Sequence, residues 1–171
     1  VGRNGAGKTT LTKILAGDGQ PSQGFVDRSG EIGYLPQDPR SGDPEQLART
    51  RILNARNLGD TLEAMTRASI EMGSTDAAVA TAAMAAYGKF EERFQAAGGY
   101  AAEAEAAAIA GNLGLKGQIL DQPLKTLSGG QRRRIELARI LFSSAPTMVL
   151  DEPTNHLDAD SVVWLREFLK S

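Results

Sequence analysis

The chain has 171 residues, enough for one domain of ordinary size or for one domain with an insertion. Hydrophobic residues make up 41% of it and aromatic residues only 5%, so a buried core must consist mostly of aliphatic side chains and alanine. The net charge of −2 gives no general attraction to nucleic acid or to anionic membranes, and the absence of cysteine excludes disulfides and thiolate metal sites.

Neither membrane insertion nor export is indicated by the sequence. No apolar run approaches the roughly 20 residues that a helix needs to cross a bilayer, and no signal peptide is visible. A chain without cysteine fits a reducing cytosol, so we expect a cytoplasmic location. The chain starts at Val1, already inside a motif, and we expect it to be a fragment of a longer protein.

A glycine-rich motif opens the chain. Residues 2–9 read Gly-Arg-Asn-Gly-Ala-Gly-Lys-Thr and fit the P-loop pattern G-x-x-x-x-G-K-[ST] at every fixed position. Glycines let the backbone turn its N–H groups toward phosphate oxygens, and the following helix directs its positive end at the same anion. A glycine-rich helix start that arose by chance is the alternative. The residues expected to bind ATP here are Gly2, Asn4, Gly5, Ala6, Gly7, Lys8, Thr9 and Thr10, with the Thr9 hydroxyl on Mg²⁺.

The elements predicted next are a helix, a short strand and then several longer helices. Leu11, Ile14 and Leu15 recur at helical spacing, and Gly17 predicts the end of that helix. After a turn-rich stretch, alanine-rich segments predict helices over 55–72, 76–97 and 100–113, with breaks at 73–74 and 98–99. Two consecutive helices with a short break predict an antiparallel helical hairpin.

A second glycine-rich loop precedes the next predicted helix. Residues 127–131 read Leu-Ser-Gly-Gly-Gln, and the helix is expected to begin near Arg132. Its buried face is marked by Ile135, Ala138, Leu141 and Phe142. Ser128 can be interpreted simply as a helix cap followed by loop glycines. That interpretation leaves a second glycine-rich helix start in a P-loop chain unexplained.

An apolar strand over 147–150 is predicted to lead into two carboxylates, Asp151 and Glu152. This order is typical of a Walker B strand, in which Asp151 holds Mg²⁺ through water and Glu152 acts on the attacking water as a general base. A charged pair at a strand end can also be merely solvated. Together with a P-loop in the same chain, the catalytic interpretation is favoured.

The loop at residues 127–131 matches the signature motif of ATP-binding-cassette (ABC) ATPases, and it lies between Walker A and Walker B in that family's order. The resemblance covers nearly the whole chain. It implies that two cassettes meet head to tail, the second cassette belonging to the same parent chain or to a second copy. It further implies that ATP held by the partner cassette is contacted by Ser128, Gly129, Gly130 and Gln131.

Two smaller motifs extend the resemblance. Gln37, after Tyr34-Leu35-Pro36, matches the Q-loop glutamine that binds Mg²⁺ and senses the γ-phosphate, so the resemblance makes it a candidate catalytic residue beside Glu152. Without the resemblance, Gln37 can equally be a polar residue that follows a strand. Asp158, at the end of Asn-His-Leu-Asp, matches the D-loop residue that couples the two sites. The only histidine, His156, belongs to this run and is not interpreted as the family's switch histidine.

Residues 152–158, Glu-Pro-Thr-Asn-His-Leu-Asp, resemble the ABC-F class of ABC proteins, which carry two cassettes on one chain. The helical stretch over 55–97 is similar to the arm that is inserted in the first cassette of that class, although the charges over residues 45–93 are nearly balanced. The chain thus resembles a first cassette. The resemblance implies an ATPase that acts with the ribosome, in translation or in antibiotic resistance. The alternatives are the ATP-binding subunit of a membrane transporter and a non-catalytic regulatory cassette; Lys8, Asp151 and Glu152 argue against the latter.

The resemblance implies an α/β P-loop NTPase fold with a mostly parallel sheet and an inserted helical subdomain. Residues 1–171 are expected to form a single truncated ABC domain, with a catalytic core at 1–37 and 127–171 and a helical subdomain at 38–126. The aromatic residue that stacks on adenine and the switch histidine of the family have no counterpart in these residues. For this chain alone we therefore expect weak nucleotide binding and negligible turnover.

Overall fold

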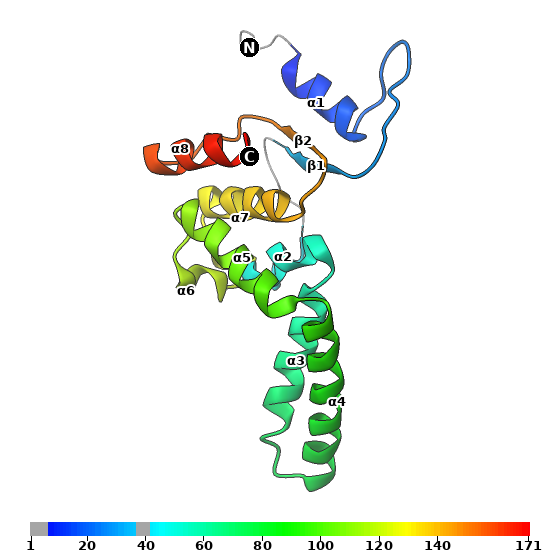
Figure 1. Ribbon diagram of the computed structural model, residues 1–171, viewed down its shortest axis with the longest axis vertical. Coiled ribbons are helices and arrows are strands. Elements are labelled where there is room, and N and C mark those ends of the chain that lie inside the picture. The colour runs from blue at the N-terminus through cyan, green and yellow to red at the C-terminus, as the bar shows by residue number, and fades with distance from the viewer. Residues whose placement is uncertain (1–6, 37–41) are drawn as a thin grey trace.

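The computed structural model describes residues 7–36 and 42–171, and its outline is elongated (Figure 1). One end holds helix α1 (Lys8–Ala16) and the strands β1 (Ile32–Leu35) and β2 (Thr147–Leu150), a layer of helices follows, and two long helices project at the other end. Within the described ranges, no helix combines the length and the apolar character that crossing a membrane requires.

Helix α1 begins and ends at glycines in the left-handed conformation, which favours glycine because a side chain would be strained there. Gly7 has φ 78° and precedes the helix, and Gly17 has φ 95° and follows it. The Gly17 N–H donates to the Ile14 carbonyl oxygen at 3.2 Å, which closes the last turn where the sequence predicts the helix to stop. Leu11 and Leu15 stay exposed because, of the described elements, mainly β1 and β2 pack against α1.

The two strands form a parallel sheet, as the resemblance implies. Ile32 lies opposite Thr147 and Leu35 opposite Leu150, and the Asp151 N–H extends the ladder by donating to the Leu35 carbonyl oxygen at 3.1 Å. Parallel strands far apart in sequence need a long crossover, and residues 48–142 supply it as helices. The carboxyl ends of both strands therefore open on the same edge of the sheet.

The layer of helices below the sheet carries the core. It consists of α2 (Ala48–Leu53), α5 (Gly99–Asn112) and α7 (Gly129–Phe142), with the short α6 (Gly117–Leu120) and two 3₁₀ turns, Asn54–Arg56 and Leu124–Thr126. Helix α8 (Ala159–Phe168) contacts α5. The core is mainly aliphatic, as the low aromatic content predicts; among its fully buried members are Ile52, Leu53, Leu113, Leu115, Ile135, Ile140, Phe94 and Phe142.

The two projecting helices, α3 (Gly59–Glu71) and α4 (Ala77–Ala96), pack side by side and are called the hairpin below (Figure 1). Asp76 begins the second helix, because its Oδ1 accepts a hydrogen bond from the Ala78 N–H at 2.8 Å. These are the helices predicted over 55–72 and 76–97, and α5 corresponds to the helix predicted over 100–113.

The expected start of the first hairpin helix, at residue 55, is wrong. Residues 54–56 form a 3₁₀ turn, Asn57 adopts a left-handed φ of 58°, and the helix begins only at Gly59. The Asn54 side chain sets this break, since its Oδ1 accepts from the Asp60 N–H at 3.1 Å. An asparagine side chain can take a backbone hydrogen bond that would otherwise belong to a helix. This effect is local, and a pattern of alanine-rich helical segments does not predict it.

Candidate nucleotide-binding site

The described part of the P-loop is its junction with helix α1. Lys8 and Thr9 lie in the first turn of α1 and are half-buried, and Thr10 is exposed. The first N–H groups of a helix lack partners within it and attract anions, so this end of α1 suits a phosphate. Gly7 supplies the left-handed turn just before it. The expected contacts from Gly2, Asn4, Gly5 and Ala6 lie outside the described residues, as does Gln37.

Asp151 lies directly after β2, at the carboxyl edge of the sheet, and is only 5% exposed. Its Oδ2 is buried and has no hydrogen-bond partner among the described residues. A buried carboxylate oxygen without a partner is unfavourable unless a cation or its water completes it. The geometry therefore fits an Asp that accepts from a hydrated cation.

The next residue, Glu152, is oriented differently. It is exposed, has a left-handed φ of 50°, and its Oε2 accepts a hydrogen bond from Asn155 Nδ2 at 2.7 Å. A residue with a side chain rarely adopts this conformation, and such positions gather at functional sites. The turn directs the two successive carboxylates to different surroundings, one buried and one open to solvent.

The described residues contain no group of three or more His, Cys, Asp or Glu that could hold a metal ion by itself. A Mg²⁺ site of the nucleotide type needs only one or two protein ligands, which act together with phosphate oxygens and water. Thr9 and Asp151 are the described residues that fit such a site, because α1 packs against β2.

The glycine-rich loop at 127–131 is the start of helix α7, so the expected helix start near Arg132 is wrong. Helix α7 begins at Gly129, because Ser128 and Gln131 form a reciprocal capping box. The Gln131 N–H donates to Ser128 Oγ at 3.2 Å, and the Ser128 N–H donates to Gln131 Oε1 at 2.8 Å. Ser128 and Gly129 are exposed, and Gly130 lies against His156.

Arg133 is a buried residue of α7 that sequence reasoning missed. Its guanidinium donates to the carbonyl oxygens of Pro36 at 3.1 Å, of Asp151 at 2.6 Å and of Glu152 at 3.0 Å. These three residues follow the carboxyl ends of the two strands of the sheet. In the sequence it is one of three successive arginines, and nothing in that run distinguishes the buried one.

Asp158 begins helix α8. Its Oδ1 accepts from the Ser161 N–H at 2.8 Å, and this hydrogen bond, with help from the Ser161 side chain and the charge of Arg134, lowers the pKa of the Asp158 carboxyl. The carboxylate therefore stays ionised as an N-cap.

On β1, burial raises the pKa of the Tyr34 hydroxyl.

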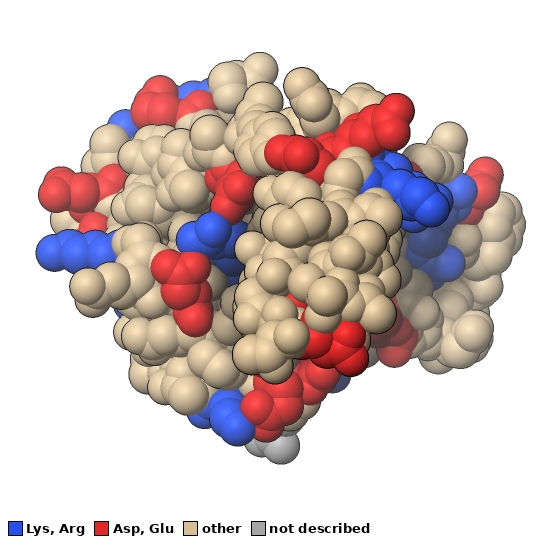
Figure 2. Space-filling view, turned by 90° about the horizontal axis from the view of Figure 1, so that it is seen from below, with Lys and Arg blue, Asp and Glu red and all other residues tan. Residues whose placement is uncertain are grey.

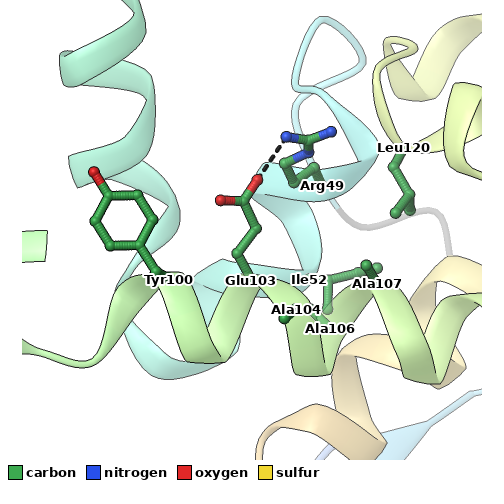
Figure 3. Close-up of a pocket in the computed structure, with 8 residues that line it drawn as sticks. All are labelled: Arg49, Ile52, Tyr100, Glu103, Ala104, Ala106, Ala107 and Leu120. Atoms are coloured by element: carbon green, nitrogen blue, oxygen red, sulfur yellow. Dashed lines mark hydrogen bonds and ion pairs between the residues drawn. The ribbon is translucent and has the colours of Figure 1, made fainter. Parts of the chain in front are cut away.

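A hollow of about 280 Å³ lies apart from these motifs, among α2, α5 and α6 (Figure 3). Figure 3 shows Arg49 of α2 directed at Glu103 of α5, and the two form an ion pair of 2.6 Å. Arg49 also pairs with Asp121 at 2.6 Å. Its charge is therefore already balanced by two carboxylates, which makes this hollow a joint between helices rather than a site for a charged ligand.

The sequence matches the ABC transporter family over residues 1–155. The chain belongs to this family. It is 41% identical over 179 residues to the tylosin resistance ATP-binding protein TlrC of Streptomyces fradiae, covering 99% of the chain and 31% of TlrC. It is 38% identical over 172 residues to the energy-dependent translational throttle protein EttA of Escherichia coli K12, covering 99% of the chain and 30% of EttA. Both relatives are ABC-F proteins, and the chain spans about a third of their length.

Solved structures agree on the fold. The chain is similar to the RNase-L Inhibitor with a TM-score of 0.61 and 22% sequence identity, over 99% of the chain and 25% of that protein. The α/β P-loop fold with a parallel sheet and inserted helices, expected from the motifs, is therefore confirmed. ABC domains of this kind bind ATP.

Proposed function

We propose that the full-length protein containing this chain binds Mg-ATP between two cassettes and hydrolyses it, in the manner of ABC-F proteins. The observation that carries the proposal is the buried Asp151 carboxylate, which has an oxygen without a partner among the described residues and lies one residue before the exposed Glu152. A P-loop helix packs on the same strand. These features together support a nucleotide site with its hydrolytic carboxylate in place.

Each motif residue has a chemical role in this proposal. Lys8 neutralises charge on the β- and γ-phosphates, and Thr9, Gln37 and Asp151 hold Mg²⁺, which supplies charge neutralisation as the terminal phosphate leaves. Asn155 fixes one oxygen of Glu152 and leaves the other free to orient the attacking water and accept its proton. Gln37 also reports the presence of the γ-phosphate.

A second cassette completes the site in this proposal. Ser128 and Gly129 are exposed at the positive end of α7, which supports a role in binding the phosphates of ATP held by a partner cassette. Gly130 and Gln131 complete that contact, and Asp158 couples the two sites from the start of α8. We divide the domain into a catalytic core at 1–37 and 127–171 and a helical subdomain at 38–126.

We further propose the ribosome as the partner and the cytoplasm as the place of action. One relative is named for throttling translation and another for resistance to tylosin. We therefore propose that ATP-driven closure of two cassettes acts on translation, either as regulation or as protection against an antibiotic.

The hairpin has a surface that limits how it could touch such a partner. Residues 59–96 contain three basic and six acidic side chains. Figure 2, seen from the hairpin end, shows acidic and basic groups interspersed, with no broad basic patch among the described residues on this face. Ile70 and Met84 are exposed apolar side chains, 72% and 57%. Apolar or protein contacts suit this surface better than phosphate contacts.

Hydrolysis by the full-length protein tests the proposal. The wild type is expected to hydrolyse Mg-ATP, Lys8→Ala to lose ATP binding, and Glu152→Gln to bind ATP without turnover. Lys170→Ala is the matched control, because Lys170 forms an exposed ion pair with Glu167 and belongs to none of the motifs. Wild-type turnover by the Glu152→Gln protein would contradict the assigned role of this carboxylate.

A further inference from the structure

Arg133 joins the signature helix to the ends of both strands. It is 6% exposed, and its Nη2 donates to the carbonyl oxygens of Asp151 and Glu152 at 2.6 and 3.0 Å. Its Nη1 donates to the Pro36 carbonyl oxygen at 3.1 Å. One planar guanidinium therefore fixes the residue before Gln37 and the two residues that carry the catalytic carboxylates.

The hydrogen bonds matter most at Glu152, whose backbone is in the left-handed region with φ 50°. A residue with a side chain occupies that region only when its surroundings fix it there. The Arg133 guanidinium fixes the carbonyl side of this residue, and Asn155 fixes its carboxylate at 2.7 Å. Removing the guanidinium would let the peptide between Asp151 and Glu152 rotate and would turn the carboxylate away.

Arg133 and the signature serine lie on the same rigid element. Ser128 caps α7, and Arg133 follows about one and a half turns later, at about 1.5 Å of rise per residue. The capping box holds the helix start. Arg133 therefore connects the helix that Ser128 caps to the carbonyl oxygens at the ends of both strands.

We propose that Arg133 is a positioning residue for hydrolysis, which holds Glu152 in the reactive arrangement and links the carboxyl ends of both strands to the signature helix. This inference rests on the proposed ATPase function. Arg133 acts within its own cassette, through the backbone, without touching nucleotide. Its loss therefore affects the hydrolytic step and leaves ATP binding in place.

The test compares three variants of the full-length protein. Arg133→Met keeps the length of the side chain but cannot donate, Arg133→Lys keeps the charge but loses the planar pair of donors, and Arg166→Met removes an exposed arginine of α8 as the control. Steady-state kinetics gives kcat and KM, and a fluorescent ATP analogue gives the affinity for nucleotide.

The expected kcat of Arg133→Met is about 10- to 100-fold below wild type, with KM and nucleotide affinity within about threefold, since a small misplacement of a catalytic group is sufficient. The kcat of Arg133→Lys is expected to lie between those of Arg133→Met and the wild type, and the kcat of Arg166→Met is expected to equal that of the wild type. Combining Arg133→Met with Glu152→Gln should lower the residual single-turnover rate no further than Glu152→Gln alone, because both changes disable the same carboxylate.

An unchanged kcat in Arg133→Met, a loss of nucleotide affinity that accounts for the lower rate, or additive effects in the double variant would each overturn the proposal. If Arg133→Met does not fold, Arg133→Lys is judged by the same criteria. A wild-type protein without any ATPase activity is a separate result, because it contradicts the proposed function and not the role of Arg133.

Discussion

Arg56 holds Phe142 in two ways at once. Its guanidinium carbon lies 3.9 Å from the centre of the Phe142 ring, and its Nε donates to the Phe142 carbonyl oxygen at 2.6 Å. Arg56 lies at the base of the hairpin and Phe142 at the end of α7, so this contact ties the projecting helices to the helix that begins with the signature motif.

Arg56→Ala is expected to lower the stability of the chain by about 2 kcal/mol, because a charge-assisted hydrogen bond and a cation–π contact are lost together. For a domain of this size that corresponds to a fall in the thermal unfolding midpoint of about 4–8 °C. The control is Glu105→Gln, which weakens only the half-exposed ion pair to Arg56 and should shift the midpoint far less. Equal shifts in the two variants would contradict the special role of the Phe142 contact.

Two glycines of the same helix, α5, should respond oppositely to alanine. A Cβ on Gly99 would lie 2.6 Å from the buried Phe94 ring, whereas a Cβ on Gly111 would meet nothing within 4 Å. Gly99→Ala is therefore expected to destabilise the protein by about 1–3 kcal/mol, and Gly111→Ala to stabilise it by up to about 1 kcal/mol through helix propensity. The thermal unfolding midpoints of both variants, compared with that of the wild type, test this prediction. A raised midpoint for Gly99→Ala would show that the Phe94 ring is free to move aside.

Much of this organisation follows from local sequence. The P-loop glycines, Gly17 and the run at 147–150 predict α1 and β2 at their observed positions, because backbone turns and buried strands depend on nearby residues. The signature and Walker B motifs predict Ser128, Asp151 and Glu152 as site residues in the same way.

Other features depend on specific side-chain contacts, some of them local and some between segments far apart in the chain. The break at Asn57 and the true start of α7 are set by side-chain hydrogen bonds, which hydrophobic periodicity does not record. Arg133 could not be singled out, because its importance arises only when α7 meets the ends of β1 and β2. Charge alone favours an exposed position for an arginine.

Asp151→Asn is expected to affect the thermal stability of the protein and its Mg²⁺-dependent ATP binding differently. Because Oδ2 is buried and unpartnered among the described residues, a neutral amide of the same shape is expected to leave the unfolding midpoint of the nucleotide-free protein unchanged or slightly raised. The same change should abolish the strengthening of ATP binding by Mg²⁺. Calorimetric titrations with Mg²⁺ and with a chelator measure this, using the exposed Asp160→Asn as control. Tight Mg²⁺-dependent binding by the Asp151→Asn protein would argue against the metal site.

The Asp158 cap makes the start of α8 sensitive to acid. The hydrogen bond from Ser161 lowers the pKa of the Asp158 carboxyl below its ordinary value of 3.8. The ionised cap therefore contributes its full stabilisation above about pH 3.8. This stabilisation is lost as the pH falls through the lower pKa that the carboxyl has in the folded protein. An NMR titration of the Asp158 carboxyl carbon should therefore give a midpoint below 3.8. Asp158→Asn, which still caps a helix, should remove this pH dependence. A midpoint at or above the ordinary value would show that the cap does not form.

Co-sedimentation with ribosomes tests the central claim most directly. The full-length protein carries Glu152→Gln, together with the matching change in any second cassette, so that ATP closes the cassettes without being consumed. The proposed function predicts that this protein pellets with ribosomes in the presence of Mg-ATP and stays in the supernatant without nucleotide. Retained ATP binding with no ribosome binding in either condition would contradict the translation role and favour a transporter or another partner.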